Sequence, residues 1–141
     1  MAMLDTSVLG SYYCPETLSP AVNAALLTIS NPHISILGEV EFTSLLSFKV
    51  RCGHMAAAEA ARIRQLFFQH RAQHLYRIVT VSQREFSLAA RWLGRFNTSL
   101  RTLDALQLAT ASSVRQTLWT TDKILATSAK MLGVPCKLIS L

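Results

Sequence analysis

At 141 residues the chain has the length of one domain, and we expect a single domain over residues 1–141. Half of its residues are hydrophobic and no low-complexity tract or internal repeat occurs, which excludes disordered and repeat architectures. The formal net charge of +6 favours polyanionic ligands, although basic proteins without such ligands are also common.

The first half of the chain alternates short apolar runs with helical patterns. Ser19 and Pro20 form a good helix start, with serine as the N-cap and proline at the first helical position. A run of alanines after Met55 is strongly helix-forming. The predicted elements are, in order, a strand over 2–5, helices over 6–13 and 19–29, a strand over 33–36, and helices over 37–51 and 55–74.

The second half continues the alternation. Its predicted elements are a strand over 76–81, helices over 82–96 and 102–115, a strand over 117–120, a helix over 121–132 that Gly133 ends, and a strand over 137–139. Strands that alternate with helices pair mainly in parallel and carry helices on both faces of their sheet. The sequence therefore predicts an α/β fold with three layers, α/β/α, around a central, mostly parallel five-stranded sheet.

The three aspartates of the chain all lie where predicted elements begin or end. Asp5 and Asp122 follow predicted strands, and Asp104 lies in the first turn of a helix for which Thr102 is the predicted N-cap. Because the carboxyl ends of parallel strands share one edge of the sheet, these side chains can converge there. A single aspartate in a first helical turn usually only stabilises the helix end, so the inference depends on their joint placement.

A fourth acid lies on the helix predicted over 37–51. Glu41 shares an apolar stripe with Leu45 and Phe48, and burying a carboxylate there is costly unless something pairs with it. Glu39 lies roughly 200° around the same helix and also has apolar neighbours. Periodicity alone does not decide which of the two glutamates faces the aspartates.

Four neighbouring carboxylates repel one another, and without a cation some of them take up protons. Mg²⁺ or Mn²⁺ relieves this repulsion because hard cations prefer oxygen ligands. Mg²⁺ also keeps several water molecules, which leaves room for a substrate phosphate and for an activated water in an in-line attack. An acidic cluster in a basic protein therefore indicates a divalent metal that acts on a polyanion.

Four segments of the chain resemble the motifs of PIN-domain ribonucleases, in the same order and at similar spacing. The third segment is very similar to that of the VapC toxin branch, and LGV at 132–134 resembles the approach to the family's closing strand. The resemblance covers almost the whole chain. The four segments are LDTSVL at 4–9, VEFTSLL at 40–46, LRTLDALQLA at 100–109 and TTDKIL at 120–125.

The resemblance implies a Mg²⁺- or Mn²⁺-dependent endoribonuclease that acts as the toxin of a bacterial type II toxin–antitoxin system. It assigns catalysis and metal binding to Asp5, Glu41, Asp104 and Asp122, and so selects Glu41 over Glu39. It also implies an RNA substrate, a cognate VapB-like antitoxin and a homodimer.

Other residues of these motifs have implied supporting roles. Ser7 and Thr120 fall where the family has hydroxyls that support the acids or a water molecule, and Arg101 is the best candidate for a phosphate contact. One departure from the family pattern is Gln107, where many relatives have histidine, three residues after Asp104 and on nearly the same helix face. This change puts substrate contact or support of the acids in question, whereas the acids themselves are all present.

The middle of the chain is basic. Ten basic residues and only two acids occur between Lys49 and Arg101. Arg84, Arg91 and Arg95 form one helical stripe that could follow RNA phosphates, although a solvated helix face explains each arginine equally well.

The helix predicted over 55–74 carries two further patterns. His70 and His74 have a spacing that zinc sites use, but no third ligand accompanies them, so we expect a solvated face. The family resemblance also implies a hydrophobic groove that the antitoxin covers, although ordinary packing is the favoured interpretation for most of its candidates. These candidates are Phe42, Leu46, Leu66, Phe67 and Phe68.

The main alternative function is a non-catalytic PIN-like module that binds RNA or protein. Degenerate members of the family typically lack one or more of the acids, and this chain has all four. A phosphatase of the haloacid-dehalogenase type would need a second aspartate where Ser7 stands. Three widely spaced cysteines, the early Asp5 and the absence of an unbroken apolar span lead us to expect a cytoplasmic protein with reduced thiols, no signal peptide and no membrane segment.

Overall fold

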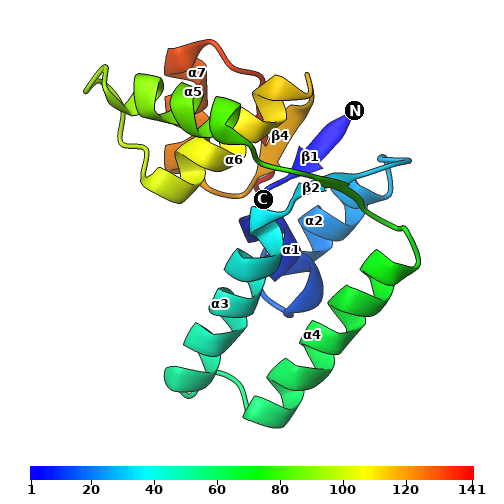
Figure 1. The fold of residues 1–141 in the computed structure, drawn as a ribbon. Coiled ribbons are helices and arrows are strands. Elements are labelled where there is room, and N and C mark those ends of the chain that lie inside the picture. The colour runs from blue at the N-terminus through cyan, green and yellow to red at the C-terminus, as the bar shows by residue number, and fades with distance from the viewer.

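All 141 residues are described by the computed structural model, in which five strands form one parallel sheet (Figure 1). The order across the sheet is β3-β2-β1-β4-β5, so β1 is the central strand. The strands are β1 (Ala2–Leu4), β2 (His33–Ser35), β3 (Arg77–Val79), β4 (Thr117–Thr120) and β5 (Cys136–Leu138).

Successive side chains of β1 enter two different cores, one on each face of the sheet. Met3 packs into a core with Leu118 of β4, whereas Leu4 packs into a core with Ile34 of β2. Side chains alternate between the faces of a strand, and a strand that is buried on both faces must be apolar at every position. This is why the short Ala-Met-Leu run forms the centre of the sheet.

Seven helices cover the two faces of the sheet (Figure 1). One face carries α1 (Thr6–Tyr13), α2 (Ser19–Leu26), α3 (Leu37–Arg51) and α4 (Ala57–Ala72), whose buried residues belong to the core that contains Leu4. The other face carries α5 (Gln83–Leu93), α6 (Thr102–Ser113) and α7 (Lys123–Leu132), which belong to the core that contains Met3. The predicted three-layer α/β/α fold with a parallel sheet is confirmed.

The strand order reverses between β1 and β4. The chain passes from β1 outward to β2 and β3, and it then returns to the other side of β1 to form β4 and β5. In open α/β sheets, ligands bind beyond the carboxyl ends of the strands at such a reversal. Asp5 directly follows β1, and Asp122 lies two residues after the end of β4.

Helices α3 and α4 lie side by side and extend from the sheet as a pair (Figure 1). Phe42 of α3 and Phe67 of α4 are fully buried, with ring centroids 5.0 Å apart. Leu46 is also buried, whereas Leu66 is 44% exposed. Ordinary packing therefore accounts for most of the candidate groove residues, as favoured from the sequence.

The base of this helix pair holds a buried polar network. The Tyr13 hydroxyl is 2.7 Å from the Tyr76 hydroxyl and 2.7 Å from Nδ1 of His70. His70 is half-buried, so the solvated face predicted for it is wrong, because α4 turns this side chain toward α1. His74 is exposed after the end of α4, as expected.

Several predicted element ends differ from those in the structure. Ser19 is the first residue of α2 and not its N-cap, because its hydroxyl donates to the Ser11 carbonyl (2.6 Å) and accepts from the Glu16 N–H (2.9 Å). Helix α2 ends at Leu26, before the predicted residue 29, because the N–H of Thr28 bonds three residues back and tightens the last turn.

Two expectations about the environment of the chain can be compared with the structure. No helix combines the length and the apolar character needed to cross a bilayer. All three cysteines are free thiols, and they are not equally accessible: Cys14 is buried, Cys52 is exposed and Cys136 is half-buried.

Candidate functional site

Asp5 lies at the end of the central strand, where its side chain is only 5% exposed. Its Oδ2 accepts hydrogen bonds from the hydroxyls of Ser7 (2.7 Å) and Thr120 (2.9 Å). The Ser7 oxygen in turn accepts the N–H of Thr121 at 3.0 Å. Both hydroxyls that the resemblance assigned to this region thus contact the same carboxylate.

Burial raises the pKa of the Asp5 carboxyl above its ordinary value, and the hydrogen bonds from Ser7 and Thr120 oppose this rise. Burial has the larger effect because an ionised carboxylate loses its hydration. No basic side chain pairs with Asp5. The central strand therefore ends in an anion that its protein environment stabilises only in part.

Glu41 comes to the same region from α3. Its Oε1 accepts a hydrogen bond from Nε2 of Gln107 on α6 at 2.7 Å. Burial raises the pKa of the Glu41 carboxyl, the Gln107 hydrogen bond lowers it, and the negative charges of Asp5 and Asp104 raise it further. Glu41 is thus half-buried and close to two of the three aspartates.

Glu39 has a different environment, although it lies only two residues earlier on α3. Its carboxylate forms a salt bridge with Arg71 of α4. The orientation of α3 thus turns Glu39 toward the neighbouring helix and Glu41 toward α6. Of the two glutamates that periodicity left open, the structure brings Glu41 to the aspartates.

Asp104 lies in the first turn of α6, for which the N-cap is Arg101 and not the predicted Thr102. Burial raises the pKa of the Asp104 carboxyl, and the charges of Asp5 and Asp122 raise it further. A hydrogen bond with the Arg101 backbone and the charge of the Arg101 side chain act in the opposite direction. Arg101 is exposed, so its guanidinium group is accessible beside the acids.

Asp122 is the N-cap of α7, one position before the helix begins at Lys123, whereas the sequence predicted a helix start at Thr121. Its Oδ1 accepts the backbone N–H groups of Ile124 (2.8 Å) and Leu125 (3.2 Å). Two donors on a single oxygen fix the carboxylate and leave Oδ2 available for another contact. Asp122 therefore caps α7, and its second carboxylate oxygen can still contact a ligand.

Electrostatic coupling connects all four acids in one continuous group. The negative charges of Asp5 and Asp104 raise the pKa of Glu41, and those of Asp5 and Asp122 raise the pKa of Asp104. No group of three acidic, histidine or cysteine side chains is close enough to hold a metal ion by itself. An all-oxygen donor set with unrelieved repulsion fits a hard cation that keeps several waters and takes only a few carboxylates, as Mg²⁺ usually does.

Two polar side chains near the acids have contacts that sequence reasoning did not predict. Gln107 is fully buried, and its Nε2 lies 2.7 Å from Glu41 and 3.5 Å from the Thr6 hydroxyl, while its Oε1 has no hydrogen-bond partner. Thr6 also acts on the Glu41 carboxyl by a hydrogen bond that lowers its pKa. The position of Thr6 next to Asp5 in the first motif was the available signal.

The remaining sequence candidates are on the surface. Arg84, Arg91 and Arg95 are all exposed, so they have no structural role that would exclude contact with a ligand. Among the aromatic residues of the same region, Trp92 belongs to the core, whereas Phe86 and Phe96 are exposed.

Comparison with known proteins identifies the family of this arrangement. The family model described as the PIN domain matches residues 2–130, a segment that includes all four acids. No curated protein matches the chain.

Solved structures match over nearly the full length, at low sequence identity. FitAcB from Neisseria gonorrhoeae is 17% identical, with a TM-score of 0.72 over 97% of this chain and 96% of its own. VapC20 from Mycobacterium tuberculosis, described as a toxin that cleaves the sarcin–ricin loop, is 20% identical, with a TM-score of 0.69 over 91% and 95%. VapBC2 from Rickettsia felis, bound to a DNA fragment from its promoter, is 15% identical, with a TM-score of 0.72 over 99% and 98%. At these identities the likeness establishes the fold.

Proposed function

This chain belongs to the PIN domain family, and we propose that it is a divalent-metal-dependent endoribonuclease that acts as the toxin of a toxin–antitoxin pair. The proposal is supported by the placement of Asp5, Glu41, Asp104 and Asp122, which come from four separate parts of the sequence and lie near enough for their charges to act on one another. Acids that repel one another at the end of a sheet weaken the fold, so they indicate a functional site.

The residues of the site have distinct roles in this proposal. Asp5, Glu41, Asp104 and Asp122 would hold Mg²⁺ or Mn²⁺, because carboxylate oxygens are the donors that hard cations prefer. When bound, such an ion lowers the pKa of a water molecule and stabilises negative charge on a phosphodiester. The hydroxyls of Ser7 and Thr120 orient Asp5.

Two further side chains complete the proposed site. Gln107 holds the Glu41 carboxylate by its Nε2 hydrogen bond. Arg101 is exposed beside Asp104 and would contact a backbone phosphate of the RNA. The products expected from hydrolysis by water are a 5′-phosphate and a 3′-hydroxyl.

The biological role is inferred from the structural neighbours. VapC20 is described as a toxin, and VapBC2 as a complex bound to promoter DNA. By analogy we propose a cognate VapB-like antitoxin and a homodimer. An RNA-cleaving toxin acts where cellular RNA is found, so we also propose a cytoplasmic location, which agrees with three free thiols.

The decisive test is RNA cleavage by the purified, partner-free protein in the presence of Mg²⁺ or Mn²⁺. We expect cleavage of cellular RNA that EDTA abolishes, and a loss of roughly 100-fold or more in Asp5→Asn and Asp104→Asn, because stabilisation of developing charge usually contributes most to catalysis. Mapping of the RNA ends will identify the substrate.

The two glutamates of α3 supply a matched pair for this test. Glu41→Gln should lose cleavage, whereas Glu39→Gln should keep it, since a glutamine there can still accept a hydrogen bond from Arg71. If the partner-free protein leaves all cellular RNA intact with either metal, or if Asp104→Asn is as toxic in cells as the wild type, the protein is a non-catalytic binding module. Cleavage by Asp104→Asn at the wild-type rate would instead remove Asp104 from the catalytic site.

A further inference from the structure

The charge on the surface of the molecule is almost entirely positive. Of the eight acidic residues only Glu16 is exposed, whereas every lysine and arginine except Lys49 and Arg71 is exposed. The only salt bridge in the structure joins Arg71 to Glu39. The exposed cations therefore lack a salt-bridge partner within the protein, and a polyanion is the ligand that such a surface attracts.

The cations without any side-chain partner are concentrated on one side of the sheet. The exposed cations that lie over aromatic rings are Arg51, Arg64 and Lys137. All the other exposed cations except Arg62 and Arg77 lie within residues 84–130, in the layer of α5, α6 and α7. The same stretch contains no exposed acid. The unpaired positive charge therefore gathers on the layer that also supplies two of the four clustered acids.

Helix α5 presents three of these cations in a row. Its buried side includes Glu85 and Trp92, whereas Arg84 and Arg91 lie on its exposed side, two turns and about 10 Å apart along the axis. Arg95 follows one turn later, just beyond the end of the helix. None of the three arginines forms a salt bridge or lies over an aromatic ring. Such a row suits the repeated charges of a nucleic-acid backbone better than a single anionic group.

The row of arginines begins near the acids. Residues 94–101 connect α5 to α6, and the two helices pack against each other (Figure 1). A short connection between packed helices makes them antiparallel, so the end of α5 lies near the start of α6. Arg95 therefore lies at the same end of the helix pair as Arg101 and Asp104, and Arg84 lies at the far end.

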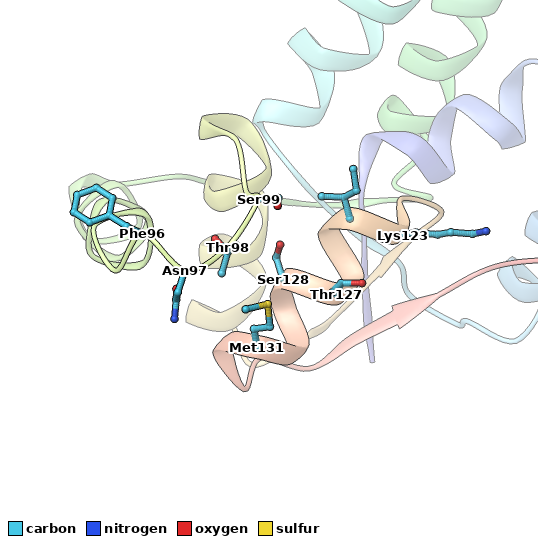
Figure 2. A pocket seen from close by; sticks show the side chains of 9 residues that line it. Phe96, Asn97, Thr98, Ser99, Lys123, Thr127, Ser128 and Met131 are labelled. Carbon is cyan, nitrogen blue, oxygen red and sulfur yellow. The ribbon is translucent and has the colours of Figure 1, made fainter.

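The surface between the end of α5 and α7 contains no acidic side chain. In Figure 2 the loop that follows Arg95 faces α7 across an open hollow, which is lined by polar and apolar side chains and by Lys123. Lys123 directly follows Asp122, and Ser99 on the other wall lies two residues before Arg101. An RNA strand that leaves the acids on this side therefore meets no repulsive charge before it reaches α5.

We infer that Arg91 and Arg95 bind phosphates of the RNA strand that extends from the acids past Arg101, and that Arg84 prolongs this surface for longer strands. The inference rests on the proposed ribonuclease function and adds to it a binding surface outside the acids. Phosphate contacts hold and orient a strand without reading its sequence. Binding through α5 is therefore independent of sequence and weakens as salt is added.

The test uses the full-length Asp5→Asn protein in EDTA, so that nothing is cleaved, and a labelled single-stranded RNA. Fluorescence anisotropy gives the Kd at several salt concentrations. In this background, Arg91→Gln/Arg95→Gln should reduce the slope of log Kd against log salt by about 2, one for each lost phosphate contact. Glutamine is a good helix former, so the substitutions preserve α5.

A matched double variant separates the α5 surface from the general positive charge of the protein. Arg62→Gln/Arg77→Gln removes two exposed cations that lie on α4 and β3, away from the α5–α7 layer, and it should leave the slope unchanged. An equal fall of the slope in both double variants, or an unchanged slope in Arg91→Gln/Arg95→Gln, overturns the α5 surface even where the wild type cleaves RNA.

Polyglutamate distinguishes RNA from an acidic protein segment as the ligand of this surface. It should displace the labelled RNA less well than unlabelled RNA does at the same concentration of charge, because release of the counterions condensed on the nucleic acid drives its binding. Equal displacement by polyglutamate would make α5 a docking site for acidic peptides and overturn the inference. RNA binding through α5 without any cleavage by the wild type would instead overturn the ribonuclease function.

Discussion

At the scale of single residues, the site is defined by a carboxylate in an unfavourable place. Asp5 is buried at the end of β1, and only hydroxyl and backbone groups donate hydrogen bonds to it. Replacing such a carboxylate with an amide of the same shape removes the charge and keeps an acceptor for Ser7 and Thr120. The Asp5→Asn substitution should therefore stabilise the fold, although it should also remove the RNA cleavage proposed for the site.

We expect Asp5→Asn in EDTA to melt several degrees above the wild type at neutral pH, since about 1 kcal/mol changes Tm by roughly 2–8 °C in a domain of this size. The raised pKa of Asp5 means that its ionised form weakens the fold. The loss of folding stability caused by the ionised carboxylate is absent below the ordinary carboxyl pKa of about 4. It grows as the pH rises through the raised pKa of Asp5 in the folded protein. The two melting curves should therefore coincide near pH 4.

Mg²⁺ provides the control for this experiment. An ion that binds only the folded state stabilises it by mass action. Adding Mg²⁺ should raise the Tm of the wild type and leave that of Asp5→Asn nearly unchanged. A wild type that is more stable than Asp5→Asn in EDTA at pH 7 would show that the protein environment already compensates the Asp5 charge.

Substitutions of Gln107 can distinguish a role in positioning Glu41 from a role in packing the core. Gln107→Met keeps a similar volume, and it removes both the donor to Glu41 and the buried Oε1 that has no partner. We expect cleavage and Mg²⁺ affinity to fall by roughly 10- to 100-fold, as when other supports of metal ligands are lost. Stability should change little or rise, because an unpaired buried carbonyl has been removed.

Gln107→His is the matched variant, because an imidazole N–H can replace the lost donor. It should recover part of the activity that Gln107→Met loses, measured by cleavage rate and by Mg²⁺ titration of the same samples. Equal Mg²⁺ affinity in the wild type and Gln107→Met would assign Gln107 to packing alone.

At the scale of elements, the site depends on the close approach of α1 and α3. A Cβ atom at Gly10 of α1 would lie 2.7 Å from Cδ2 of Leu45 on α3, so the glycine allows the two helices to touch. At Gly38 of α3 the nearest atom, Cδ1 of Leu9, is 3.9 Å away, which is an ordinary contact. This packing sets the distance between Ser7 on α1 and Glu41 on α3.

The two glycines therefore respond differently to the same substitution. Replacing a helical glycine by alanine usually stabilises a helix by about 1 kcal/mol. We expect Gly38→Ala to show most of this gain, and Gly10→Ala to show none, because the new methyl group must displace Leu45. Urea unfolding curves measure both free energies, and a gain of equal size in the two variants would contradict the close approach.

At the scale of the whole molecule, charge is divided between four converging acids and a basic remainder. The net charge is +6 although half of all acidic residues belong to the cluster. The proposed RNA substrate would bind such a surface through release of counterions, and its binding should weaken steeply as salt is added. The acids alone would repel the same polymer.

Arg101 and Arg115 flank the two ends of α6, and both are exposed. With the uncleaving Asp5→Asn protein as background, Arg101→Gln should reduce the slope of log Kd against log salt by about 1, the value for one lost phosphate contact. Arg115→Gln should leave the slope unchanged. Fluorescence anisotropy of a labelled single-stranded RNA measures both, and equal slopes would remove Arg101 from the RNA contact.

The sequence by itself was sufficient for the architecture and for the list of acids. Alternating apolar runs and helical patterns predicted five parallel strands and three layers, and the helix over 37–51 and the strand over 117–120 have the predicted ends. These features can be predicted locally, because hydrophobic periodicity and the residues typical of helix ends involve only neighbouring positions in the chain. The metal-binding and catalytic roles of the four acids remain predictions.

Tertiary structure alone decided which groups meet. Periodicity could not separate Glu39 from Glu41, since both have apolar neighbours on α3. The family resemblance selected Glu41 without a physical reason. The structure supplies that reason in Arg71 on α4, which pairs with Glu39, and in Gln107 on α6, which is 66 residues from Glu41 in the chain. The rotation of a helix against its partners depends on packing across the whole core, and the apolar period of the helix does not determine it.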